Sequence, residues 1–500
     1  MNAVAIPVSV LAAESAAAAP PTARALYLDL ADGGAAAGAA AHGAAKVAAG
    51  DYLRRQLDVA AALPCDLPAD LADFGQWIAG HTEAVGIEYG RYLAERKQGA
   101  PRRYFTNRSH AMHFLTGVAP TKLVDGSWLY GLLARWDDAS LRPLIRIYLE
   151  ELGSGVPDKN HVLIYRRLLE QHGGGQRWQH LSDDHFVQGA IQLALAFHAE
   201  RYLPELIGFN LGYEQLPLHL LITAYELNEL GIDPYYFTLH VTVDNADTGH
   251  ALTALRGLEQ AMPAVGDRAA FLRRVAAGYR LNDLGASTLS VIASFDLERE
   301  VIAMLAAKSV VGKHMHSDYC RVAGRTVNEW LADPAQIGGF VAAMEANGWI
   351  RRGEAPENSR FWRLVQGERA EMFGVFSAYE LQLLQDWIAA PRAAGGEDGT
   401  GASQPASRVL SYRARVRGMA IGRSDETAPA HRPRPVLRRN RPSDNDAGDD
   451  ANELRQLQTR LAALDNQRAA IGMLVELMSP ALHHTPPGLM ATRIFTQLYE

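Results

Sequence analysis

The segment 240–250 places four side chains that could bind a metal on one predicted helix. Its sequence is His240-Val-Thr-Val-Asp244-Asn-Ala-Asp247-Thr-Gly-His250. At about 100° per residue, Asp244 and Asp247 lie about 40° and about 20° to either side of His240, and His250 lies about 80° away. Imidazole and carboxylate donors together suit iron or manganese. The spacing therefore predicts a metal-binding stripe, although a polar stripe facing solvent would have the same spacing.

Three further ionisable residues stand in apolar surroundings. Glu151 ends one predicted helix, and His161 begins the next after the break GSGVPDKN. Glu214 lies in the segment ELIGFNLGYEQLPLHLL. A carboxylate without a partner is costly in such surroundings. Helix bundles build two-metal sites from inward-facing Glu and His side chains on several helices, so we expect these residues to join the 240–250 stripe.

Each of these residues also has a purely structural explanation. Glu151 could be a surface residue, and the neighbouring Glu150 could take its place at the site. Glu205 competes with Glu214 for the same role. His161 lies at the start of a predicted helix, where it could be a capping or surface group.

On three motifs the chain resembles the heme-oxygenase-like diiron oxidases and oxygenases, also called the iron-containing redox enzyme family. The run from Glu151 to His161 resembles the family's Glu, loop and His. The sequence YEQLP at 213–217 resembles its Tyr-Glu dipeptide followed by a polar residue and Pro, and YFTLHVTVD at 236–244 resembles its aromatic-rich HxxxD helix. The resemblance covers about residues 104–310.

This resemblance implies an all-α, heme-oxygenase-like helical bundle that binds ferrous iron, two ions per chain, with O2 as co-substrate. It also implies an external electron donor and a small amine, amino acid or acid as substrate, in some relatives within natural-product pathways. The implied ligands are Glu151, His161, Glu214, His240, Asp244 and either Asp247 or His250.

One departure from the family pattern leaves alternatives open. The family commonly has a second His three residues after the Asp of the HxxxD helix, where this chain has Asp247. If neither Asp247 nor His250 reaches the metal, a mononuclear or metal-independent enzyme on the same fold is the alternative. The other alternative is a non-enzymatic helical adaptor, which the N-terminal arm, the arginine-rich linker and the leucine-rich terminal helix favour.

The helices expected to position these residues follow from the apolar spacing. Between 104 and 310, apolar residues recur every three or four positions, and Gly, Asp and Pro breaks separate the runs. Five or more helices with short connections describe an all-α bundle. We expect a disordered Ala-rich arm over 1–50, a helical extension over 51–103, the metal-binding bundle over 104–310, a smaller C-terminal subdomain over 311–390, a disordered linker over 391–450 and a helical tail over 451–500.

Composition excludes several other classes of protein. The 500 residues carry 49 basic and 56 acidic side chains, a net charge of −7, which does not indicate nucleic-acid binding. The arginine-rich RPRPVLRRNRP lies in the expected linker, where it could contact RNA or an acidic surface or be simply solvated. The two cysteines, Cys65 and Cys320, exclude a disulfide scaffold and a Cys-rich metal site. We expect a cytoplasmic protein without a membrane span, in which the leucine-rich tail could support a homodimer.

Overall fold

A computed structural model of the chain describes residues 20–33, 38–243, 249–367, 370–391, 455–464 and 466–499. These residues are almost entirely helical, which confirms the all-α prediction. The one strand pair among them is a two-residue antiparallel hairpin, β1 (Arg321–Val322) with β2 (Arg325–Thr326). No helix in these ranges is long and apolar enough to cross a membrane.

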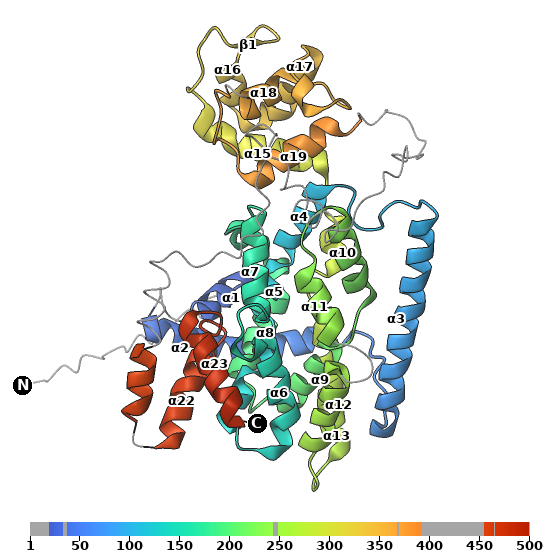
Figure 1. Cartoon of the computed structure of the whole chain (residues 1–500), viewed down its shortest axis with the longest axis vertical. Coiled ribbons are helices and arrows are strands. Elements are labelled where there is room, and N and C mark those ends of the chain that lie inside the picture. Colours follow the sequence, from blue (N-terminus) through green and yellow to red (C-terminus); the bar gives the residue numbers. More distant parts are fainter. Residues whose placement is uncertain are drawn as a thin grey trace, which may run out of the picture.

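The bundle occupies the centre of the molecule (Figure 1). Its helices are α4 (Arg108–Gly117), α5 (Ala119–Lys122), α6 (Arg142–Glu151), α7 (His161–Gln171), α8 (Val187–Phe197), α9 (Leu203–Tyr213), α10 (Leu218–Glu229), α11 (Tyr235–Val243), α12 (His250–Ala261), α13 (Arg268–Arg280) and α14 (Thr288–Ala293). A tight stretch of 3-10 helix over Ser127–Arg135 packs against α8. Helix α6 packs against α12, and α9 packs against α13.

Helices α9 and α13 cross at two glycines. A Cβ atom at Gly208 would lie 1.8 Å from the carbonyl oxygen of Val275, and one at Gly278 would lie 1.8 Å from that of Glu205. Only glycine permits this separation, because any side chain would collide with backbone. The crossing fixes α9, whose last residue is Tyr213 and which leads directly into Glu214.

The N-terminal segment corrects one prediction. Residues 20–33 and 38–50 are not a disordered arm, because they form α1 (Ala23–Ala31) and the first half of α2 (Gly38–Ala60). In α1, Leu26, Tyr27 and Leu30 are buried, and the Asp183 carboxylate accepts hydrogen bonds from the first two backbone N–H groups of the helix. Both helices pack against α8. Sparse large side chains suffice here because they share one helix face.

The long helix α3 (Phe74–Lys97) lies along the outside of the bundle (Figure 1). Its attachment centres on Glu226 of α10, a fully buried carboxylate. Glu226 accepts hydrogen bonds from the Tyr92 hydroxyl at 2.9 Å and from the backbone N–H groups of residues 103–105 at 2.5–3.0 Å. One carboxylate therefore holds both α3 and the loop that follows it.

A second group of helices stands at the top of Figure 1. It contains the β hairpin and α15 (Leu297–Gly312), α16 (Val327–Leu331), α17 (Ile337–Ala346), α18 (Arg360–Gln366) and α19 (Ala378–Ala389). The Asp386 carboxylate of α19 accepts a hydrogen bond of 2.7 Å from the backbone N–H of Ser109 in α4. The Trp387 indole donates to Glu298 at 2.6 Å. The first of these contacts joins residues 297–391 to the bundle, and the second, between α19 and α15, holds this group of helices together.

The C-terminal helices α22 (Gln467–Leu477) and α23 (Pro486–Tyr499) pack against the bundle beside α6. The Tyr148 hydroxyl donates to the carbonyl oxygen of Met478 at 2.5 Å, and Arg493 donates to that of Gly155 at 3.1 Å. Ahead of these helices, Leu457 is buried and Leu461 packs against the core, so the described part of the tail expected over 451–500 contacts its own chain. The predicted linker lies outside the described residues, except for Pro391.

Candidate metal centre

A tight turn brings Glu151 and His161 together. Helix α6 ends at Glu151, and backbone with positive φ follows at Gly153 (64°), Ser154 (48°) and Gly155 (76°). Asn160 then caps α7, its side-chain oxygen accepting from the backbone N–H of Leu163 at 3.0 Å. His161 is the first residue of α7 and is buried with Glu151. The Glu, loop and His of the sequence thus form one contact in space.

The hydrogen bonds of His240 direct one ring nitrogen into the same space. Its Nδ1 lies 2.8 Å from the carbonyl oxygen of Tyr236, an acceptor, so Nδ1 carries the proton and donates it. This leaves the lone pair on Nε2, which lies 3.1 Å from Oδ2 of Asp125. A backbone acceptor on the other ring nitrogen is the usual way in which proteins orient a metal-binding histidine.

Asp125 was not predicted as a site residue. It lies between α5 and the 3-10 helix, fully buried, and both of its oxygens accept from tyrosines. Oδ1 accepts from the Tyr213 hydroxyl at 2.9 Å, and Oδ2 accepts a short hydrogen bond from the Tyr236 hydroxyl. The available signal was a lone acidic residue in the apolar segment LVDGSWL, which has no helical periodicity to interpret.

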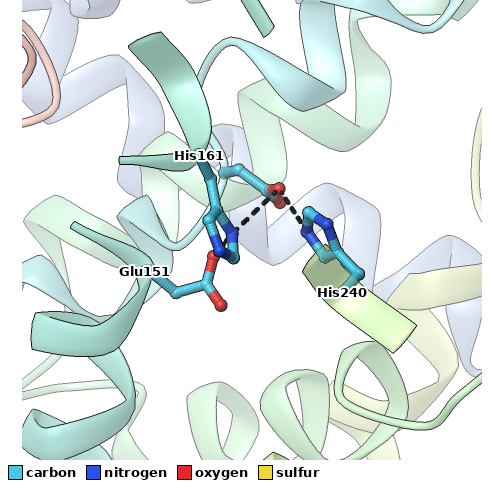
Figure 2. Close-up of side chains that lie close together, drawn as sticks. Glu151, His161 and His240 are labelled. Atoms are coloured by element: carbon cyan, nitrogen blue, oxygen red, sulfur yellow. Dashed lines mark hydrogen bonds and ion pairs between the residues drawn. The ribbon is translucent and has the colours of Figure 1, made fainter. Parts of the chain in front are cut away.

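These residues form a first group of possible metal ligands, namely Asp125, Glu151, His161 and His240. One ligand atom from each lies within 4.8 Å of the others, and all four residues are buried. Two ligand atoms of one ion, each with a bond of about 2.0–2.2 Å, lie at most about 4.4 Å apart. The spacing of these four atoms is close to that limit. Figure 2 shows Glu151 beside His161, and the rings of His161 and His240 both directed at one carboxylate, that of Asp125.

A second group contains Glu151, Glu214 and His250. His250 Nδ1 lies 3.0 Å from Glu214 Oε2 and 3.5 Å from Glu151 Oε1. The other carboxylate oxygen of Glu151, Oε2, lies 2.5 Å from His161 Nδ1. Glu151 is therefore common to both groups and presents one oxygen to each. Glu150, the alternative to Glu151, contacts His250 Nε2 at 2.8 Å.

The sequence placed His240 and His250 on one helix, and this is wrong. Helix α11 ends at Val243, and α12 begins at His250. The two histidines thus belong to different helices, and each enters a different group. Asp244 and Asp247 lie outside the described residues. Glu205, the competitor of Glu214, instead forms an ion pair of 2.6 Å with Arg274.

The electrostatics of the first group favour a bound cation. Burial raises the pKa of the Asp125 carboxyl, but the ammonium of Lys122 and the contacts with His240 and His161 outweigh burial and hold that pKa well below its usual range. Burial also opposes ionisation of Glu151, and the charge of His161 lowers its pKa. Among the described residues, Asp125 and Glu151 form ion pairs with histidines alone.

The donor set fits iron. Mixed imidazole and carboxylate ligands suit iron, manganese or zinc rather than calcium or magnesium. In addition, the buried Nδ1 of His161 makes no hydrogen bond of acceptable geometry, although Glu151 lies beside it. Such a close imidazole–carboxylate pair fits one ion when both groups are deprotonated, as metal ligands must be.

A cavity of about 350 Å³ opens onto both groups. Glu151, Glu214 and His240 line it. The rest of its wall is mixed, with apolar side chains such as Val118 and Leu220 and polar ones such as Lys122. The site can therefore admit a small molecule next to the predicted ligands.

Comparison with known proteins gave one match. Residues 112–283, about one third of the chain, match the family model described as iron-containing redox enzyme. No curated protein and no solved structure matched the chain. Both ligand groups fall inside the matched segment. Residues 112–283 are therefore similar in sequence to the iron-containing redox enzyme family.

Proposed function

We propose that this protein is a non-heme iron oxidoreductase that binds two ferrous ions and uses O2 to oxidise a small organic substrate. Glu151 carries this proposal, because its two oxygens face two separate groups of buried donors. A carboxylate shared in this way is a feature of two-iron sites in helix bundles. The family match supports the redox chemistry, and the cavity supports a small substrate.

The first ion would be held by Asp125, Glu151, His161 and His240, and the second by Glu151, Glu214 and His250. In this proposal His250 takes the role for which the sequence offered either His250 or Asp247. Iron bound there would supply electrons for the reduction of O2, and an external electron donor would restore the ferrous state. The substrate would be a small amine, amino acid or acid.

The residues around the ligands have three tasks. The hydroxyl groups of Tyr213 and Tyr236 hold Asp125 in one orientation and occupy one lone pair on each of its oxygens. The Tyr236 carbonyl fixes the tautomer of His240. Leu220 and Val118 form part of the cavity wall, where apolar side chains limit the access of water.

The test is anaerobic titration of the metal-free protein with ferrous iron, followed by Mössbauer spectroscopy. We expect two irons per chain in the wild type. His250→Ala should bind one, because it removes the sole imidazole of the second group. His240→Ala should weaken the other site by about 10- to 100-fold or more, the effect usual for the loss of metal-supporting groups.

The matched control is His198→Ala, because His198 is a half-buried histidine whose Nε2 contacts the Lys46 carbonyl oxygen away from both groups. It should retain two irons. A wild type that binds one iron would instead establish a mononuclear site, and a wild type that binds none would exclude an iron enzyme. Consumption of O2 by the loaded protein, measured with an electrode, tests the second half of the proposal.

A further inference from the structure

Lys122 is a charged residue of the cavity wall that is not among the predicted metal ligands. It is the last residue of α5, is half-buried and lines the same cavity as Glu151, Glu214 and His240. Its ammonium donates one hydrogen bond, of 3.2 Å, to the Tyr213 hydroxyl. Within the described part of the chain, it forms no ion pair with a carboxylate. An ammonium has three N–H donors, so two remain for a ligand in the cavity.

The surroundings of Lys122 hold its ammonium beside the metal ligands. Nζ lies 5.2 Å from the ring centroid of Tyr213 and 5.8 Å from that of Tyr236, both close enough for cation–π attraction. The Tyr213 hydroxyl, which accepts from Lys122, donates in turn to Asp125 at 2.9 Å. The ammonium is therefore two hydrogen bonds from a predicted iron ligand.

We propose that Lys122 binds the carboxylate of the substrate, so that the enzyme acts on acids or amino acids rather than on simple amines. This inference rests on the proposed function and narrows its substrate class. A carboxylate held at Nζ leaves the first few carbons of the substrate beside the ligand groups. The cavity, at about 350 Å³, is at the small end of ligand sites, which favours a short molecule.

The apolar part of the cavity wall could contact a short hydrocarbon chain attached to such a carboxylate. Val118, Pro217, Leu220 and Leu284 contribute apolar surface to it. A simple amine would place a second positive charge near Lys122, where burial weakens the screening of like charges. An amino acid meets the same requirement as an acid, because it carries the carboxylate as well.

The test uses a matched set of probes with the iron-loaded protein under anaerobic conditions. Hexanoate, hexanamide and hexylamine share one carbon chain and differ in charge, and calorimetry measures their binding. We expect hexanoate to bind the wild type about ten-fold more tightly than hexanamide, or better, as a charge-assisted hydrogen bond requires. Hexylamine should bind no more tightly than the amide.

Three variants separate recognition from other roles of Lys122. Lys122→Met should lower the affinity for hexanoate to the level of hexanamide, and Lys122→Arg should retain the preference for the acid. Lys46→Met is the control, because Lys46 is a half-buried lysine over the ring of Phe197, outside the cavity. It should bind all three probes as the wild type does.

Two results would overturn the inference. One is an unchanged affinity of Lys122→Met for hexanoate, which would mean that the acid binds elsewhere, for instance to iron directly. The other is a parallel loss of iron and of hexanoate in Lys122→Met, which would mean that Lys122 acts through Asp125. If the wild type binds no iron yet discriminates through Lys122, the carboxylate site stands and the proposed function fails.

Discussion

At the scale of single residues, the site depends on how each donor atom is held. Asp125 accepts from two tyrosines, and His240 donates to a backbone carbonyl. Glu151 and His161 lie at the adjoining ends of α6 and α7. Preorganisation of this kind reduces the conformational cost of metal binding, because the ligands need not be ordered when the ion arrives.

Asp125→Asn tests whether the residue that the sequence did not reveal is a ligand. The amide keeps the shape but loses the charge, so we expect the first iron to bind at least ten-fold more weakly. Because an NH2 group cannot accept from a tyrosine hydroxyl, the free energy of unfolding should also fall by about 1–3 kcal/mol. Iron per chain and urea unfolding measure the two effects.

The control is Asp66→Asn, in a carboxylate that also accepts from a tyrosine, Tyr279, at 2.7 Å, but lies outside the cavity. This variant should retain both irons. If Asp125→Asn retains them as well, Asp125 supports the fold and is not a ligand.

At the scale of elements, the C-terminal helices support the helix that carries His161. His483 is buried, and its Nδ1 lies 3.1 Å from Nδ2 of Asn160, the residue that caps α7. Burial and the neighbouring His484 keep the pKa of His483 well below its usual value. The ring is therefore neutral at pH 7, and Nδ1 can accept a hydrogen bond from the amide.

His483→Ala should therefore affect the metal site from a distance. It leaves one N–H of Asn160 unpaired and opens a void, so we expect the free energy of unfolding to fall by about 1–3 kcal/mol. The first iron should also bind less tightly. Titration with ferrous iron and urea unfolding are the measurements. His484→Ala, one position along and not bonded to Asn160, should have the smaller effect on iron, and equal effects would contradict this role for the tail.

At the scale of the whole molecule, helices from the N-terminal and the C-terminal parts of the described chain pack on the bundle. Tyr27 of α1 is buried with its ring edge-on to Phe186, at 5.3 Å between centroids, and to Trp178, at 6.0 Å. At the other end of the sequence, the C-terminal helices pack against α6 and the turn that follows it. The bundle is thus completed by segments that lie outside the matched residues 112–283.

Tyr27→Ala measures how much the N-terminal helix contributes. Removing a buried aromatic side chain should lower the free energy of unfolding of the bundle by about 3–5 kcal/mol. Tyr319→Ala removes the same side chain at a position that is 95% exposed, and should change it by less than about 0.5 kcal/mol. Urea unfolding followed by circular dichroism compares the two. Equal stability of both variants would show that α1 is dispensable.

Local sequence determined the helices and most of the candidate ligands. The three- and four-residue spacing of apolar side chains is a local property, so helices could be predicted throughout 104–310. Glu151, His161 and Glu214 could be identified because each is ionisable in an apolar segment, and His240 and His250 because of their spacing with Asp244 and Asp247. The structure brings these five residues together in two groups that share Glu151.

Other features depend on contacts between residues far apart in the chain, and only the tertiary structure decided them. Asp125 meets His240 across 115 positions, and Asn160 meets His483 across 323. The contact of α1 with the turn before α8 is of the same kind, because Asp183 in that turn caps a helix 160 residues earlier. The local spacing of apolar residues does not identify such distant partners. It reports which face of a helix is buried, whereas packing of the whole chain determines what buries it.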